Sequence, residues 1–249
     1  IPDAAASYEV SQDQLTYTFK LKQNIKFHDG TPFTSEDVKA TYDRLRNPPE
    51  GVVSLRQASF EDITSIETPD KYTVVFKLGK PDAAMLQNFA SPRNCLYSAA
   101  KLKQDPNFPR QHILGTGPFR FVEHVKGSHW IGKRYEEYHE AGKPYLDGFR
   151  AVLLSGAPMV NSLQGGQIAA EFRGFTPQQR DQLKQALGDK IAVQESGWVC
   201  KLDILFNTAK KPFDDARVRR ALNMAIDRWS GAQNLQRIAF VREVGGVMR

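Results

Sequence analysis

The stretch that decides the fold is residues 15–46, LTYTFKLKQNIKFHDGTPFTSEDVKATYDRLR. It opens with apolar side chains at Leu15, Tyr17, Phe19 and Leu21, which alternate with threonines and lysines. A period of two in a segment rich in β-branched and aromatic residues predicts a half-buried β-strand. The stretch therefore begins as a strand with one face toward a core.

A turn and a capped helix are expected after this strand. Residues 28–30 (HDG) are a turn signal. Thr34 precedes Asp37 by three residues, which is the spacing of a capping box, and the helix dipole favours an acid in the first turn. Apolar residues recur at helical spacing from Val38 onward, so the unit is predicted as strand, turn, extended loop and capped helix.

Four stretches of the chain together resemble one known family. The first is FHDGTPFTSEDV, and the others follow in the family's order: GTGPF at 115–119, YHEAGKPYLD at 138–147 and FNTAKKPFDDARVRRALNMAID at 206–227. The set resembles the family 5 extracellular solute-binding proteins, which are the receptor subunits of peptide, nickel and opine ABC importers. The resemblance covers nearly the whole chain.

Length and composition place the chain in the range of soluble globular proteins. Its 249 residues suffice for one large domain or two smaller ones, and 41% of them are hydrophobic and 25% charged. No apolar run approaches the roughly 18 residues that indicate a membrane span. No signal peptide is visible in a chain that starts at Ile1. The net charge of +6 comes from basic residues dispersed among acidic ones, so we expect no nucleic-acid partner.

The two cysteines, Cys95 and Cys200, leave the redox compartment open. They either pair in an oxidising compartment or remain two buried thiols, because sequence alone does not give their separation. Cys200 follows Trp198 and Val199 in an apolar segment, which favours an inert buried thiol over a nucleophile.

Residues 1–137 are predicted as an antiparallel α+β unit. Residues 1–10 are interpreted as an entry segment with Pro2 and a run of small residues, and a short helix is expected from Pro81 to Phe89. Two hairpins are expected, with arms at 63–67 and 72–78 and at 119–125 and 130–134.

The pattern changes near Tyr138. Alternation of strands and helices then predicts an α/β layer with parallel pairing. A last helix is expected to follow Asp214 and Asp215. The expected strands are 149–154, 168–172, 191–194 and 202–206, and the expected helices are 159–163 and 176–187.

The resemblance implies a mixed α/β (α+β) architecture, the type II periplasmic-binding-protein fold with an extra domain. It makes residues 1–137 the extra α+β domain of the first lobe, 138–206 the middle part of that lobe, and 207–249 the crossover and start of the second lobe. The family's opening strands and most of its second lobe have no counterpart, so the chain resembles an incomplete fragment. The hinge between lobes is expected near Leu205 to Lys211.

The sequence lacks the motifs of covalent and phosphate chemistry. It contains no G-x-S-x-G nucleophile elbow and no G-x-x-x-x-G-K-[ST] phosphate loop. His124 and His129 lie across a predicted hairpin, but a metal site usually needs three or four ligands. Adjacent acids such as Asp214 and Asp215 are better explained by the helix dipole than by acid–base catalysis. We therefore expect no enzymatic activity, no metal and no cofactor.

Polar and aromatic residues at predicted element ends near the domain junctions are the candidate ligand-binding residues. An indole can wall an apolar pocket, and a guanidinium can bind a carboxylate through two parallel hydrogen bonds. Arg93 sits where some nickel-binding members of the resembled family carry a cleft arginine. An ordinary surface salt bridge is the alternative for each polar group. The candidates are Arg93, Asn94, Tyr97, Glu171, Arg173 and Trp198.

The resemblance implies a substrate-binding component of an ABC importer. Such a protein would capture a small solute reversibly, an oligopeptide or a related carboxylate-bearing compound, and deliver it to a membrane permease. It would be a monomer, either periplasmic or anchored outside the cell by lipid. Two alternatives stay open, a ligand-sensing domain without transport and an enzyme on the same fold.

Overall fold

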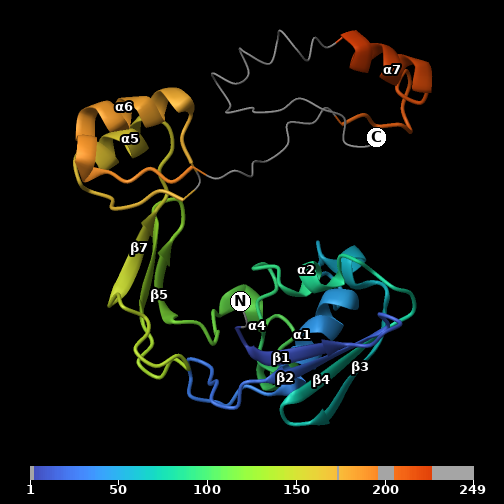
Figure 1. Ribbon diagram of the computed structural model, residues 1–249. Helices are drawn as coiled ribbons and strands as arrows, with labels where there is room; N and C mark the ends of the chain where they lie inside the picture. The colour runs from blue at the N-terminus through green and yellow to red at the C-terminus, as the bar shows by residue number, and fades with distance from the viewer. Residues whose placement is uncertain (1–2, 173, 196–204, 226–249) are drawn as a thin grey trace. The chain divides into compact units, whose positions relative to one another are not determined.

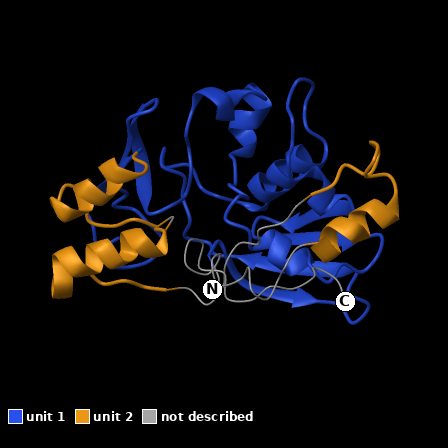
Figure 2. Ribbon diagram, turned by 90° about the horizontal axis from the view of Figure 1, so that it is seen from above, with its two compact units in different colours: residues 1–153 blue, residues 154–249 orange. Residues whose placement is uncertain are grey.

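The computed structural model describes residues 3–172, 174–195 and 205–225. The chain forms two compact units, Ile1–Leu153 and Leu154–Arg249 (Figure 2). Arg173, Trp198, Cys200 and most of the strand expected at 202–206 lie outside the described residues.

A four-stranded antiparallel sheet organises the first part of unit 1 (Figure 1). Its strands follow the order β1-β2-β4-β3, with residue bounds Ala5–Val10, Thr16–Leu21, Thr73–Leu78 and Ile63–Asp70. The strand expected from Leu15 to Leu21 is confirmed as β2. The hairpin expected with arms at 63–67 and 72–78 is confirmed as β3 and β4. β1, however, is a strand within the entry segment, for which the sequence analysis named no strand. It pairs with β2, and four of its residues, from Ala6 to Glu9, are exposed, so it carries little hydrophobic signal.

The turn and capped helix expected after β2 are confirmed. Gly30 has φ of +83°, which suits glycine, and the Asp29 carboxylate accepts hydrogen bonds from the amide and hydroxyl of Thr31. Helix α1 spans Ser35–Arg46. The carboxylate of Asp37 accepts a hydrogen bond of 2.7 Å from the amide of Thr34, which is the capping-box contact that the spacing predicts.

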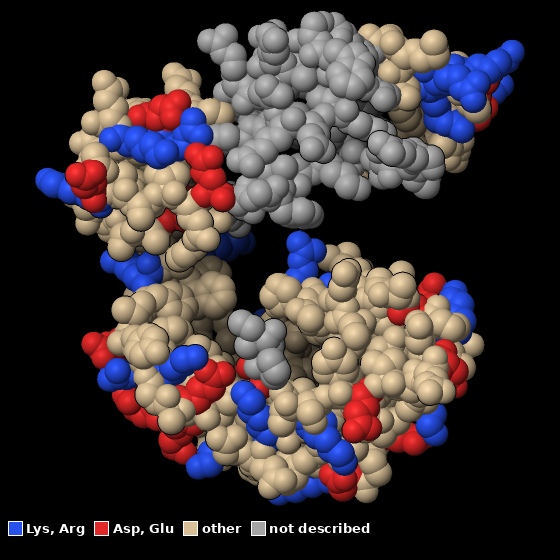
Figure 3. Space-filling view, in the orientation of Figure 1, with Lys and Arg blue, Asp and Glu red and all other residues tan. Residues whose placement is uncertain are grey.

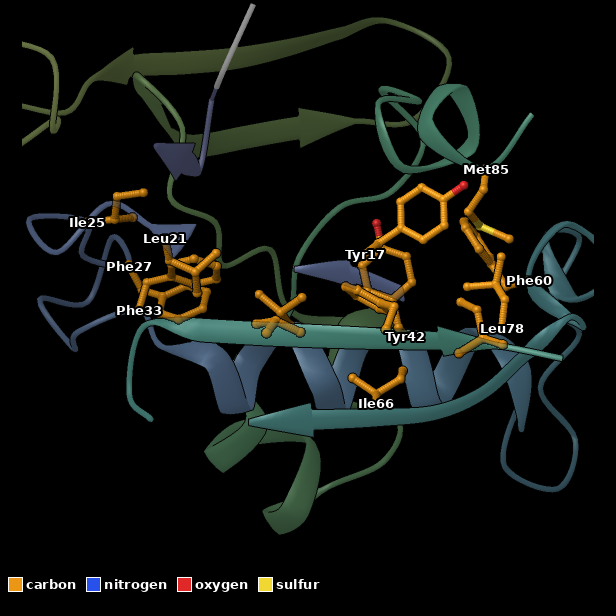
Figure 4. Packing of buried hydrophobic residues seen from close by; sticks show 14 residues of the cluster. Tyr17, Leu21, Ile25, Phe27, Phe33, Tyr42, Phe60, Ile66, Leu78 and Met85 are labelled. Carbon is orange, nitrogen blue, oxygen red and sulfur yellow. The ribbon is translucent and has the colours of Figure 1, made fainter. Parts of the chain in front are cut away.

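The core of this part lies between the sheet and α1 and is dominated by aromatic rings (Figure 4). Phe76 on β4 is 2% exposed, and its ring centroid lies 5.1 Å from that of Tyr42 on α1 and 4.6 Å from that of Phe89. Tyr42 and Phe60 meet edge-to-face at 5.1 Å. Such edge-to-face pairs add stabilisation beyond the apolar area they bury. We call this part of unit 1, residues 3–117, the core region.

The core region also contains four short helices. They are η1 (Gln57–Phe60), α2 (Met85–Phe89), α3 (Ala99–Gln104) and α4 (Phe108–Gln111). The second sheet has the antiparallel order β5-β6-β7, with bounds Phe119–Val125, His129–Arg134 and Gly148–Val152. We call it the β5–β7 sheet. Its hairpin confirms the prediction for residues 119–134, but β7 pairs antiparallel with β6, so the expected parallel pairing is wrong for this strand.

Polar contacts join the β5–β7 sheet to the core region. The Tyr135 hydroxyl donates a buried hydrogen bond of 3.0 Å to the carbonyl oxygen of Phe27. Nε2 of His28 donates to the carbonyl oxygen of Gly117 at 2.9 Å, and the amide of His28 donates to that of Gly115. The GTG motif and the HDG turn are therefore two halves of one junction.

The described part of unit 2 consists of helices and connecting segments. The helices are α5 (Ala157–Gln164), α6 (Pro177–Leu187), η2 (Gly188–Lys190) and α7 (Ala216–Ala225). Thr176 caps α6 by accepting a hydrogen bond of 3.3 Å from the amide of Gln179. Residues 168–172 and 191–194 form no strand, contrary to expectation. Among the described helices of both units, none has the length and apolar character that crossing a membrane requires.

Candidate functional site

A cavity of ≈ 1190 Å³ opens in unit 1 and is lined by parts of the chain that are distant in sequence. One wall comes from β1 and β2, through residues such as Tyr8 and Phe19. A second comes from the segment between α2 and α3, and a third from the β5–β7 sheet. The cavity exceeds the usual range of about 300–1,000 Å³ for small-molecule pockets, so it has room for a ligand of several residues' size.

The lining of the cavity is apolar and nearly uncharged. Asp3 and Arg120 are the only formally charged residues among the described residues that line it. Figure 3 shows that the Lys, Arg, Asp and Glu side chains of unit 1 lie mostly along its lower and outer edges in this view. Apolar walls with few polar groups are typical of sites for small organic solutes.

Two of the predicted site residues, Asn94 and Tyr97, lie together in the lining of this cavity. The side-chain amide of Asn94 donates hydrogen bonds to the carbonyl oxygens of Asn88 (2.6 Å) and Phe89 (3.3 Å), at the end of α2. Burial raises the pKa of the Tyr97 phenol, so its hydroxyl remains a neutral donor at physiological pH.

Helix α1 fixes the backbone around Tyr97. Oγ1 of Thr41 accepts a hydrogen bond of 2.8 Å from the Tyr97 amide. Oδ1 of Asp37 accepts one of 2.8 Å from the Ala99 amide at the start of α3. Asp37 is 6% exposed, and burial raises the pKa of its carboxyl. The capping residue predicted from sequence thus also holds the segment that carries Asn94 and Tyr97.

The other predicted site residues have different positions. Arg93 is exposed and lies beside the cavity without being part of its lining. Glu171 lies in unit 2, between α5 and α6. Arg173 and Trp198 are outside the described residues. The structure therefore brings Asn94 and Tyr97 together, with Arg93 adjacent in sequence.

The sequence reasoning missed the aromatic wall that the β5–β7 sheet contributes. Phe121, Trp130 and Phe149 line the cavity and remain 37%, 47% and 37% exposed. The predicted hairpin contained the first two, but neither had been considered as a ligand contact. Cys95 also lines the cavity and is exposed, while its pairing with Cys200 stays untested because Cys200 is outside the described residues.

No cluster of three or more His, Cys, Asp or Glu side chains suitable for a metal ion occurs in the part of the chain that the structure describes. His129 contacts Glu123 at 2.7 Å and Ser128 at 2.8 Å. The ring of His124 lies 6.4 Å from that of Trp130. These two histidines are thus engaged by neighbours on their own hairpin.

The chain is similar to known proteins over most of its length. A glutathione-binding protein, GsiB of Pectobacterium atrosepticum, is 34% identical over 230 residues, covering 90% of this chain and 43% of its own length. The chain therefore spans less than half the length of this curated relative.

Solved structures are similar as well. The binding protein AgaA of A. tumefaciens R10, in complex with agropinic acid, is 38% identical with a TM-score of 0.63, covering 67% of this chain and 34% of its own. The ABC transporter-associated periplasmic binding protein DppA of Helicobacter pylori, in complex with the peptide STSA, is 26% identical with a TM-score of 0.78. The match covers 95% of this chain and 49% of the DppA chain.

The similarity in fold agrees with the type II periplasmic-binding-protein architecture expected from the sequence. A family model described as "Bacterial extracellular solute-binding proteins, family 5 Middle" matches residues 1–237. Because this match covers nearly the whole chain, the chain belongs to the family 5 bacterial extracellular solute-binding proteins.

Proposed function

We propose that the chain is the solute-capturing part of an ABC importer. It would bind a small solute, an oligopeptide or a related carboxylate-bearing compound, and release it unchanged to a membrane permease. The observation that carries the proposal is the large, nearly uncharged cavity in unit 1, in a chain that belongs to the family 5 solute-binding proteins.

The chemistry of the cavity suits such a solute. Aromatic walls cover apolar groups, and the Tyr97 hydroxyl supplies a polar anchor within the lining. Arg93 is exposed beside the lining, where its guanidinium has the freedom to turn toward a carboxylate. The similar proteins DppA and AgaA hold a peptide and agropinic acid respectively.

Capture would involve two lobes that close around the solute. In this proposal residues 1–137 form the extra domain of the first lobe, 138–206 its middle part, and 207–249 the start of the second. The hinge lies near Leu205 to Lys211, and Glu171, Arg173 and Trp198 contribute ligand contacts from the later part of the first lobe. The protein acts as a monomer in the periplasm or on the outer face of the membrane.

Native mass spectrometry tests this function on the product of the complete gene. The protein, purified from its host under mild conditions, is expected to carry a solute that dissociates on unfolding and has the same mass before and after incubation. Calorimetric titration with a set of tripeptides then gives affinities. A solute that is chemically altered by the protein contradicts the proposal, as does the absence of any bound or titratable solute.

The contribution of Arg93 is tested by Arg93→Ala in the same protein. Loss of a hydrogen-bonded carboxylate contact is expected to weaken binding by roughly 1.5–3 kcal/mol. Arg150→Ala is the matched control, since Arg150 is also exposed and lies outside the cavity lining. Equal affinities of the two variants would remove Arg93 from the site.

A further inference from the structure

The β5–β7 sheet has one aromatic face. Its register pairs Phe121 with Gly132 and Gly132 with Phe149, and directly paired residues project to the same side of an antiparallel sheet. Trp130 is two residues from Gly132 on β6, so it shares that side. Phe119, two residues before Phe121, belongs to the same face. All five residues line the cavity.

Gly132 makes room in the middle of this face. A Cβ atom at Gly132 would lie 2.3 Å from Cε1 of Phe149, so the Phe149 ring lies flat over a position that only glycine leaves open. The ring of Phe119 meets that of Phe149 edge-to-face at 5.2 Å and holds it there. The result is an aromatic surface in which the Phe149 ring covers Gly132, with Phe121 and Trp130 on the same face.

These rings are more exposed to solvent than the aromatic rings of the core region. Trp130 is 47% exposed and Phe121 and Phe149 are 37% exposed, whereas Phe76 and Tyr42 in the core region are 2% and 5% exposed. Covering apolar surface yields roughly 25 cal/mol per Å². An acidic group placed against the ring faces would lose hydration without a partner there, because Arg120, the basic residue of the described lining, alternates with Phe121 and projects to the opposite side of β5.

We propose that this aromatic face binds an aromatic or large aliphatic side chain of the captured peptide and so sets a preference for apolar residues. The inference rests on the proposed function and assigns its specificity to one sheet. Phe121, Trp130 and Phe149 supply the ring faces, and Gly132 leaves the space that the Phe149 ring occupies. The site discriminates against an acidic side chain at the position that faces the sheet.

The test uses the product of the complete gene and four tripeptides that differ only in the central residue: Ala-Phe-Ala, Ala-Leu-Ala, Ala-Gly-Ala and Ala-Glu-Ala. Calorimetric titration is expected to show the phenylalanine and leucine peptides binding about tenfold or more tighter than the other two. Trp130→Ala and Gly132→Ala are each expected to reduce this ratio to nearly one. Gly132→Ala acts by displacing the Phe149 ring from its place over position 132.

Val122→Ala is the matched control. Val122 lies on the same strand and is 53% exposed, but it is not part of the cavity lining. This variant is expected to keep the wild-type preference. Circular dichroism of each variant shows whether it is folded, and the two test variants act independently, so loss of fold in one leaves the other as a test.

The outcomes separate this inference from the proposed function. Equal affinities for all four peptides, or an unchanged preference in both test variants, overturn the role of the aromatic face while leaving solute binding in place. Absence of binding to any peptide or co-purified solute overturns both. Acrylamide quenching of Trp130, in the complete protein with Trp198, Trp229 and any further tryptophan replaced by phenylalanine, gives a third result. A Trp130 that is already shielded without solute is covered by the protein itself, which also overturns the inference.

Discussion

Two clusters of aromatic residues in unit 1 differ in how much of their surface is exposed to solvent. In the core region, Phe76, Tyr42 and Phe60 are at most 5% exposed. The ring of Tyr42, on α1, packs edge-to-face against those of Phe76 and Phe60. In the β5–β7 sheet, Phe121 and Trp130 lie on a regular antiparallel sheet but keep more than a third of their surface exposed. Both regions form well-paired strands, so strand formation alone does not explain the difference.

The difference lies in what covers each sheet. Helix α1 covers one face of the four-stranded sheet, and its residues Val38 and Tyr42 are buried. Phe76 and Tyr42 also reach the cavity lining, but packing leaves them only 2% and 5% exposed, whereas Phe121 and Trp130 of the β5–β7 sheet present 37% and 47% of their surface. The same residue type thus stabilises the fold in one region and supplies accessible binding surface in the other. The predictions below test this contrast from the largest expected effect to the smallest.

The largest contrast is between Phe76→Ala and Phe121→Ala. Phe76→Ala leaves a void in a packed aromatic core and is expected to lower the free energy of unfolding by about 3–5 kcal/mol. Phe121→Ala removes a ring that is 37% exposed and is expected to cost less than half as much. Urea unfolding with an unchanged m-value measures both. Equal losses would mean that the two clusters are equally buried in the folded protein.

The next largest effect is expected at Asp37, whose carboxylate accepts two backbone hydrogen bonds in the core region. Asp37→Ala leaves the amides of Thr34 and Ala99 without their acceptor and is expected to cost about 1–3 kcal/mol of unfolding free energy. Because Ala99 follows the segment that carries Tyr97, solute affinity should fall as well. Glu36→Ala is the control, since Glu36 is exposed in the same helical turn and bonds only the hydroxyl of Thr68. A loss in Asp37→Ala no greater than that of the control contradicts the buried bridging role.

The third prediction concerns His139, in the junction between the two regions. Burial lowers the pKa of His139 below its ordinary value of 6.5, with Lys22 acting in the same direction and Asp3 and Glu140 opposing it. The unfolded chain therefore binds this proton more readily than the folded one. Stability should rise with pH from the lowered pKa up to about 6.5 and then level off.

His139→Phe tests this pH dependence. The variant keeps an aromatic ring but lacks the titrating group, so its loss of stability between pH 7 and pH 5 should be smaller than that of the wild type. Unfolding free energies from urea titrations at pH 5, 6 and 7 measure the difference. Parallel pH profiles for the two proteins would show that His139 keeps its ordinary pKa when folded.

The smallest expected effect is at the surface of the same junction. Lys26 and Glu137 form an ion pair of 2.7 Å, but their side chains are 49% and 59% exposed. Exposed pairs of this kind contribute about 0–1 kcal/mol and are screened by salt. A double-mutant cycle with Lys26→Ala and Glu137→Ala should give a coupling in this range that fades at 1 M NaCl. A salt-independent coupling above that range would mean that the junction is more tightly closed than its exposure indicates.

Local patterns were enough to predict the core region. The alternation in β2 and the Thr34–Asp37 spacing each depend on neighbouring residues, and both predictions are confirmed. β1 was missed because the run Ala5-Ala6-Ser7 lacks the branched residues that identify strands. Its strand character comes from pairing with β2.

Contacts between distant segments explain what the sequence did not predict. The aromatic face depends on the pairing of Gly132 with Phe149, which are seventeen positions apart, so no local pattern contains it. The parallel layer expected after Tyr138 is wrong for β7 because the strand returns to β6 as an antiparallel partner. Asn94 and Tyr97 were selected for their chemistry, and their shared place in the cavity lining depends on Thr41 of α1, which accepts a hydrogen bond from the Tyr97 amide.

The most direct test of the account uses Cys95, an exposed thiol in the cavity lining, as a reporter of occupancy. In the product of the complete gene, with Cys200 and any further cysteine replaced by serine, the rate of alkylation of Cys95 by iodoacetamide is measured with and without a saturating peptide. The account predicts that bound solute slows the alkylation of Cys95 several-fold, while a non-binding peptide leaves the rate unchanged. An identical rate under saturating solute would contradict the claim that this cavity is where the protein captures its solute.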